Sequence, residues 1–274
     1  MQMKKSFFKS AIPEGRAQLT KVIRLAGDVI TIDCAAQILG ISRTHTSKRL
    51  ARWVMQGWLR RVSQGVYVPV SLDSLVSEHV LDDPWILVPA LYKPAYIGGR
   101  SAAEHWDLTE QIFNDIVVLT GRPVRKSIQK HHGAIFTVKH LPEDKIFGTK
   151  PVWRQHTKVM ISDVHRTIID MLDDPALGGG IRHVADCLSA YLIRPDCDEQ
   201  KLIEYGERLG NGSIFKRLGF LLEGNKQSEQ LVTACSRRIT KGTAKLDSAY
   251  LCPRLVSRWN LWIPQTWLPA PLRD

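Results

Sequence analysis

The feature that most restricts the fold is a glycine-bearing turn, residues 40–42, between two short segments of helical periodicity. The segment before the turn is capped by Thr31 or Asp33 and runs to Leu39. The segment after the turn, residues 43–56, is basic. Two short helices joined by so tight a turn, with a basic second helix, are typical of a helix-turn-helix.

Segments on either side complete this pattern. Between residues 16 and 26 apolar residues recur at helical spacing, and Gly27 is expected to end that helix as a C′ glycine. Residues 58–68 place apolar residues on both sides of a Ser-Gln-Gly turn, which predicts a β-hairpin with Gly65 at positive φ. A hairpin directly after the second helix is a wing, so residues 16–70 are predicted to form a winged helix-turn-helix.

The basic helix is predicted to have one apolar face and one cationic face. With Leu50 as the centre and about 100° per residue, the side chains of Thr46, Trp53 and Val54 lie within about 60° of it. More than about 120° away lie cationic and hydrogen-bonding side chains, namely Thr44, His45, Lys48 and Arg52. Such a face suits the major groove of DNA, where Arg and Lys donate to guanine and Thr binds phosphates or bases.

Further candidates lie around this face. Arg49 is at its margin, while Arg43 and Ser47 lie nearer the core side, although Arg43 is in the first turn and can reach a phosphate. Arg60 and Arg61 are on the predicted wing. The complete set of predicted DNA-binding residues is Arg43, Thr44, His45, Ser47, Lys48, Arg49, Arg52, Arg60, Arg61 and Gln64. A solvated face without a partner is the alternative, and for His45 an exposed side chain with no role is equally open.

The positive charge of the chain is concentrated at this end. The net charge is +11, and residues 1–70 hold 12 Lys and Arg against three acidic residues. Residues 71–225 hold 18 against 21, and residues 226–274 hold eight against three. A basic module on a near-neutral body indicates an acidic polymer as partner, although a basic surface without one is common. We expect that partner to be double-stranded DNA.

Composition excludes several classes of protein. The 274 residues are 44% hydrophobic and 24% charged, as in a globular protein of about two domains. Five widely spaced cysteines with no C-x-x-C pair predict neither a disulfide framework nor a zinc site. Residues 1–13 lack the apolar run of a signal peptide, and no stretch approaches roughly eighteen apolar residues. We therefore expect a cytoplasmic protein that does not enter a membrane.

The body is predicted to be α+β, with an antiparallel or mixed sheet followed by helices. Expected strands cover residues 95–97, 115–120, 134–140 and 157–161. Expected helices cover residues 85–91, 101–106, 163–172, 181–193, 198–209 and 213–222, with Ser162 capping the third of them. The domains predicted are an extension (1–15), the winged helix (16–70) and an α+β domain (71–274), helical from about residue 162.

The sequence contains few candidates for a catalytic or metal site. His131, His132 and His140 form a local group, but no Cys, Asp or Glu completes a metal-ligand spacing nearby. Residues 195–201 resemble the PD and E-x-K elements of nucleases, yet both elements lie in one segment, as in an acidic helix N-terminus. Ser101, like Ser162, is interpreted as a helix cap. No catalytic residue, metal or cofactor is therefore predicted.

The basic tail, residues 226–274, carries Trp259, Trp262 and Trp267. Tryptophans that close the core are the favoured interpretation. Stacking on single-stranded nucleic acid is the alternative, and it requires exposed rings in a groove.

Four segments together resemble a known family. They are GWLRRVSQGVY at residues 57–67, GRSAAEHWDL at 99–108, SDVHRTIIDML at 162–172 and RLGFLLE at 217–223. In this order they are similar to the AbiEi antitoxins of bacterial type IV toxin–antitoxin systems. The resemblance extends from about residue 16 to about residue 262, and the wing segment is its least specific part because many regulators share it.

The resemblance implies a non-enzymatic repressor that binds inverted repeats in its own promoter. It also implies an antitoxin that opposes a nucleotidyltransferase toxin without needing a stable complex with it. The matched C-terminal segments look structural, so no residue is assigned to the antitoxin role. Two other functions stay open: a nuclease targeted by a winged helix, and a ligand-sensing regulator outside a toxin–antitoxin pair.

Overall fold

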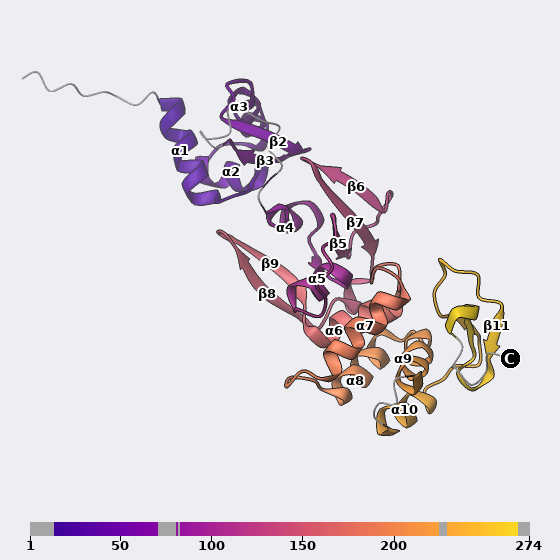
Figure 1. The fold of residues 1–274 in the computed structure, drawn as a ribbon. Helices are drawn as coiled ribbons and strands as arrows, with labels where there is room; N and C mark the ends of the chain where they lie inside the picture. Colours follow the sequence, from indigo (N-terminus) through magenta and orange to yellow (C-terminus); the bar gives the residue numbers. More distant parts are fainter. Residues whose placement is uncertain (1–13, 71–80, 82, 225–228, 268–274) are drawn as a thin grey trace, which may run out of the picture. The chain divides into compact units, whose positions relative to one another are not determined.

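A computed structural model describes residues 14–70, 81, 83–224 and 229–267. The chain divides into two compact units, Met1–Leu91 with Trp153–Thr157, and Tyr92–Val152 with Lys158–Asp274. The fold is α+β, as predicted, with a helix-turn-helix and a small sheet followed by a larger sheet and helices (Figure 1). Most of the predicted N-terminal extension, the start of the body after residue 70 and both ends of the basic tail lie outside the described residues.

The first unit begins with three helices, α1 (Glu14–Ala26), α2 (Ile32–Leu39) and α3 (Arg43–Met55). Gly27 has φ +74° and its N–H donates to Ile23 O at 3.1 Å, so the predicted C′ glycine is confirmed. Of the two candidate caps, Thr31 is the one that caps α2, because its hydroxyl accepts from Cys34 N. Gly40 ends α2 at φ +66°.

A three-stranded sheet follows, in the order β1-β3-β2. The hairpin of β2 (Leu59–Ser63) and β3 (Val66–Pro69) was predicted, and Gly65 has φ +78°. The short strand β1 (Ile30–Thr31) was not predicted; it pairs antiparallel with β3. A strand of two residues is too short to show a periodicity in the sequence, so β1 is recognised only by its pairing with β3.

One core joins the three helices to this sheet. Leu19 and Val22 of α1 pack with Leu50 and Trp53 of α3. The same cluster contains Ile30, Ala35, Leu59 and Tyr67. Beyond the sheet, a 3-10 helix (Pro84–Leu87) leads into α4 (Val88–Tyr92), where one helix was predicted.

The second unit is built on a six-stranded mixed sheet in the order β6-β7-β5-β4-β9-β8. Strands β4 (Ala95–Ile97), β5 (Asp115–Thr120), β7 (Ala134–His140) and β9 (Thr157–Ser162) correspond to predicted strands. The sheet is mixed because β5 pairs antiparallel with β4 and parallel with β7. Strands β6 (Ile128–His131) and β8 (Thr149–Arg154) were missed; they are largely exposed and polar, and they lack a buried apolar run.

Two predicted helix caps are wrong. Helix α5 (Gly99–His105) is preceded by Gly98, and the Ser101 hydroxyl instead accepts from Val117 N at 2.9 Å, which fixes the helix to β5. Helix α6 (Val164–Asp173) is capped by Asp163, not by Ser162. A carboxylate caps as well as a hydroxyl does, so sequence alone did not separate these neighbours.

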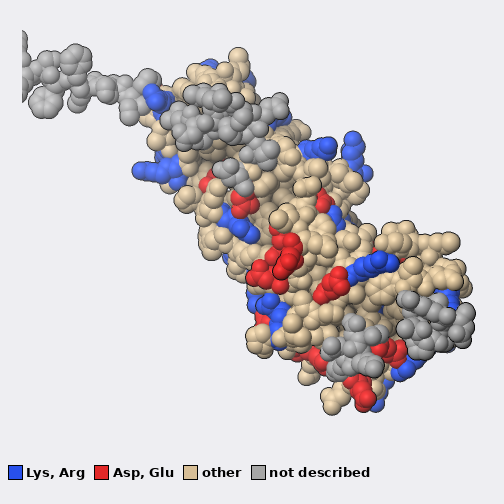
Figure 2. Space-filling view, in the orientation of Figure 1, with Lys and Arg blue, Asp and Glu red and all other residues tan. Residues whose placement is uncertain are grey.

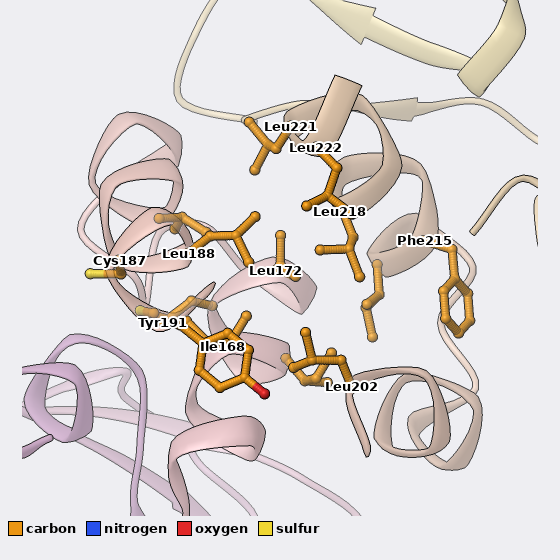
Figure 3. Packing of buried hydrophobic residues seen from close by; sticks show 14 of the residues in the cluster. Ile168, Leu172, Cys187, Leu188, Tyr191, Leu202, Phe215, Leu218, Leu221 and Leu222 are labelled. Carbon is orange, nitrogen blue, oxygen red and sulfur yellow. The ribbon is translucent and has the colours of Figure 1, made fainter. Parts of the chain in front are cut away.

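Four helices of the second unit surround one apolar core: α6 with α7 (Ile181–Leu192), α8 (Glu199–Leu209) and α9 (Ser213–Gly224). Figure 3 shows Ile168 and Leu172 of α6 among side chains of the other three helices, including Leu188, Leu202 and Leu218. Asp198 caps α8 by accepting from Lys201 N at 2.9 Å. The structural interpretation of residues 195–201 is thereby supported.

The helical region predicted from about residue 162 is present, and the basic tail that follows it, for which no secondary structure is predicted, adds one helix and a small sheet. Helix α10 (Glu229–Ser236) is followed by a three-stranded sheet of β10 (Ala244–Lys245), β12 (Leu261–Ile263) and β11 (Arg254–Val256). Trp259 is fully buried in the helical core, and Trp267 lies against Phe220. Trp259 and Trp267 therefore contribute to the packing of the second unit, which is the interpretation favoured from the sequence. Within the residues that the structure describes, no helix combines the length and hydropathy needed to cross a bilayer.

Candidate nucleic-acid interface

Helix α3 buries one face and exposes the other. Thr46, Leu50 and Trp53 are its buried residues. Thr44, His45, Lys48 and Arg52 are exposed. The core-facing and solvent-facing residues are therefore those expected from the helical period, and the long cationic side chains point away from the apolar core.

The first turn of α3 is held by Ser42. The Ser42 hydroxyl accepts from His45 N at 3.4 Å and lies 2.8 Å from His45 Nδ1, so the cap also orients the imidazole. Arg43 is exposed and forms an ion pair with Asp33 of α2, with 2.6 Å between Nη1 and Oδ1. A pair with side chains 70% and 68% exposed contributes little to stability and separates readily. Arg43 is thus available to a phosphate.

Arg49 is half-buried and has a partner on α1. Its guanidinium Nη1 donates to the amide oxygen of Gln18. The Gln18 amide nitrogen donates in turn to Glu14 at 3.1 Å. The hydrogen bond between Gln18 and Arg49 joins two residues that are 31 positions apart in sequence. The helical periodicity of α3 alone therefore does not predict it.

The wing carries the remaining candidates. Arg61 is exposed, and its Nε donates to Ser63 O at 3.3 Å within the same strand. Arg60 is half-buried on β2, and Gln64 is exposed in the turn. Ser47 is half-buried on α3, near the core side as expected. The structure thus distributes the ten candidates over α3 and the β2–β3 hairpin of one unit.

Charge on the surface follows the sequence distribution. Figure 2 shows Lys and Arg side chains projecting around α1, and larger groups of Asp and Glu over the second unit. On α3 itself every charged residue is basic. Such a surface attracts an anionic polymer and releases its counterions on binding.

The histidine group and the cysteines are the other residues considered for chemistry. Among described residues, no group of three or more His, Cys, Asp or Glu is placed to hold a metal ion. His140 Nδ1 lies 3.1 Å from Arg122 O, a backbone contact. Burial raises the pKa of the Cys187 and Cys235 thiols to about 12, so neither thiol is a nucleophile near neutral pH.

A buried polar network in the second unit was missed by the sequence analysis. Arg166 Nε donates to Asp170 Oδ1 at 2.8 Å, and Tyr96 Oη donates to Asp170 Oδ2 at 3.0 Å. Burial raises the pKa of the Asp170 carboxyl, while Arg166 and Tyr96 act in the opposite direction. The Arg166 and Asp170 spacing of one helical turn was visible in the sequence, but burial of both groups was not. The network holds α6 to β4.

Comparison with known proteins agrees with the geometry of the first unit. Residues 18–70 match the family model described as "Transcriptional regulator, AbiEi antitoxin". No curated protein matches the chain. The match covers α1 through the wing, the segment that presents the cationic face of α3. The predicted resemblance to AbiEi antitoxins is confirmed over residues 18–70, which are similar to the transcriptional regulators of that family.

Proposed function

We propose that this protein is a type IV antitoxin that represses its own promoter and has no enzymatic activity. In this proposal residues 16–70 bind inverted repeats in that promoter. Residues 71–274 oppose a nucleotidyltransferase toxin in the cytoplasm, without a stable complex between the two proteins. The match to AbiEi regulators supports the antitoxin assignment.

The observation that carries the DNA-binding part is the polarity of α3. Lys48 and Arg52 are exposed on the side away from buried Leu50 and Trp53. An α-helix fits the major groove, and Arg and Lys donate there to guanine O6 and N7. We therefore assign α3 as the recognition helix, with Lys48 and Arg52 central and Thr44, His45 and Arg49 around them.

Residues beside the recognition helix serve the DNA backbone in this proposal. Arg60 and Arg61 of the wing contact phosphate or the minor groove, and Arg43 contacts phosphate from the first turn of α3. These contacts fix the register of the protein on the duplex, while α3 reads the bases.

A gel-shift titration on promoter DNA tests this assignment. The double variant Lys48→Ala, Arg52→Ala is expected to lose affinity steeply and to flatten the dependence of affinity on salt. The matched control is Arg125→Ala, Lys126→Ala, which removes one Arg and one Lys exposed in the second unit. Unchanged binding by the recognition-helix variant would remove α3 from the interface.

The antitoxin part is tested in cells with the full-length chain. Co-expression with a nucleotidyltransferase encoded beside this gene is expected to relieve its toxicity. The Lys48→Ala, Arg52→Ala variant should still relieve toxicity but no longer repress a promoter reporter, because the two roles use different parts of the chain. A neighbouring gene of another kind, or no relief of toxicity by the intact chain, would contradict the type IV assignment.

A further inference from the structure

Helix α1 carries an exposed cation beside the recognition helix. We propose that Lys21 of α1 is an additional phosphate-contacting residue, so that the DNA interface extends beyond α3 and the wing. This inference rests on the proposed function, because it assigns a new residue to the same interface.

A cross-helix hydrogen bond shows which flank of α1 faces α3. Gln18 of α1 accepts from the guanidinium of Arg49 on α3. On the core side of Gln18 lie Leu19 and Val22, which are buried in the cluster that contains Leu50 and Trp53. Gln18 and Arg49 therefore mark a seam where the two helices meet at the edge of that core.

Lys21 lies on the solvent side of this seam. It follows Gln18 by three residues, which turns its side chain about 60° from that of Gln18, away from Leu19 and Val22. Lys21 is exposed, and no ion pair or hydrogen bond of its ammonium is present among the described residues. Its charge is thus not neutralised by a neighbouring described carboxylate.

On the other side of the seam, α3 presents Arg52. Arg52 is exposed and follows Arg49 by three residues. Lys21 has the same spacing from Gln18 on α1. Lys21 and Arg52 therefore each lie about one turn from the Gln18–Arg49 hydrogen bond, on two helices that share one core. A phosphate backbone next to the recognition helix can meet both cations.

The single acidic group described on α1 lies toward the other end of this flank. Glu14 precedes Gln18 by one turn and accepts from its amide nitrogen. A phosphate is repelled near Glu14 and attracted near Lys21, because the two charges have opposite signs. This difference in charge favours contact of the DNA backbone with α1 near Lys21 rather than near Glu14.

The test compares two exposed cations of the same helix. Arg16 lies about 160° around α1 from Gln18, on the flank away from the seam, and it is exposed like Lys21. Binding of the full-length Lys21→Ala and Arg16→Ala variants to promoter DNA is measured over a series of salt concentrations. For Lys21→Ala we expect weaker binding and a log–log salt slope smaller by about 0.9, the value for one lost phosphate contact. For Arg16→Ala we expect the parental slope, and Lys21→Arg should retain binding.

Two results would overturn the assignment: a parental slope for Lys21→Ala, or equal decreases for both alanine variants, which indicate a general charge effect. The Lys48→Ala, Arg52→Ala variant in the same titration separates this inference from the proposed function. If that variant loses binding while Lys21→Ala does not, only the role of Lys21 fails. If neither variant changes binding, the proposed interface itself fails.

Discussion

A Cβ atom placed on Gly219 would lie 2.0 Å from Cζ3 of Trp259, so the indole ring occupies the position of the missing side chain. Trp259 is fully buried, and its Nε1 donates to Glu223 Oε2 at 2.5 Å. The φ of Gly219 is not positive, so the close approach of the ring, and not backbone freedom, requires glycine here. This contact packs the C-terminal segment against α9.

We expect Gly219→Ala to destabilise the second unit. Overpacking of a well-packed core costs about 1–3 kcal/mol, and the rigid indole has little room to move. Gly242→Ala is the control, because a Cβ there meets nothing within 4 Å. Urea unfolding measures both variants; equal midpoints would show that Trp259 can shift without cost.

Arg217 is expected to be a second residue that holds the C-terminal sheet. Its Nη1 donates to Leu172 O at 2.7 Å and its Nη2 to Lys245 O at 2.9 Å, joining the end of α6 to β10. Arg217→Met keeps much of the apolar volume but leaves buried carbonyl groups without donors, at a cost of about 1–3 kcal/mol. Thermal unfolding should show this loss, and Arg237→Met, at an exposed position, should leave the midpoint unchanged.

The buried pair of Arg166 and Asp170 is expected to be intolerant of losing one partner. Asp170→Ala leaves the fully buried guanidinium without its counter-charge, which typically costs about 3–5 kcal/mol. Tyr96→Phe removes the hydrogen bond donated to Asp170 and the one accepted from Arg166 Nη2 at 3.0 Å but keeps the ion pair, so it should cost less, about 1–2 kcal/mol. Chemical denaturation of the two variants gives the comparison; similar losses would mean that the ion pair adds nothing to the hydrogen bonds.

Stability is expected to fall on mild acidification because of His165. Burial lowers the pKa of His165 from its ordinary value of 6.5, and the imidazole Nδ1 lies 2.8 Å from Tyr191 Oη. The unfolded chain therefore binds a proton at a higher pH than the native state does. The stability that comes from keeping His165 neutral is present above pH 6.5. It is lost as the pH falls from 6.5 toward the lower pKa of His165 in the native state.

The difference between parent and His165→Gln checks this expectation. The free energy of unfolding of the variant should depend less on pH below 6.5 than that of the parent. His140→Gln, at an exposed position, is the matched control for the substitution itself. Parallel curves for parent and His165→Gln would assign the acid sensitivity to other groups.

Local signals predicted most of the first unit correctly. Gly27 and Gly65 have the positive φ values expected of a helix end and a hairpin turn. The burial of Leu50 and Trp53 opposite Lys48 and Arg52 follows from the helical period alone. Each of these features depends on residues close together in the chain, so a single sequence contains the information for it.

Other features depended on partners distant in sequence. Strand β1 exists because Ile30 and Thr31 pair with Tyr67 and Val66. The choice of Asp163 over Ser162 as a cap was decided by the neighbourhood of Ser162, whose hydroxyl lies 2.8 Å from Thr167 Oγ1. The residues next to these positions in sequence predict neither strand β1 nor the choice of Asp163 as the cap.

The sequence by itself determined the helical period, the turns and the side of α3 on which cations gather. Tertiary structure alone decided that Gln18 meets Arg49, that Trp259 fills the space left by Gly219, and that the C-terminal segment forms a sheet. The physical reason is that backbone propensity and periodicity act within a few residues, whereas hydrogen bonds and packing between distant segments form only when the chain has folded and brought them together.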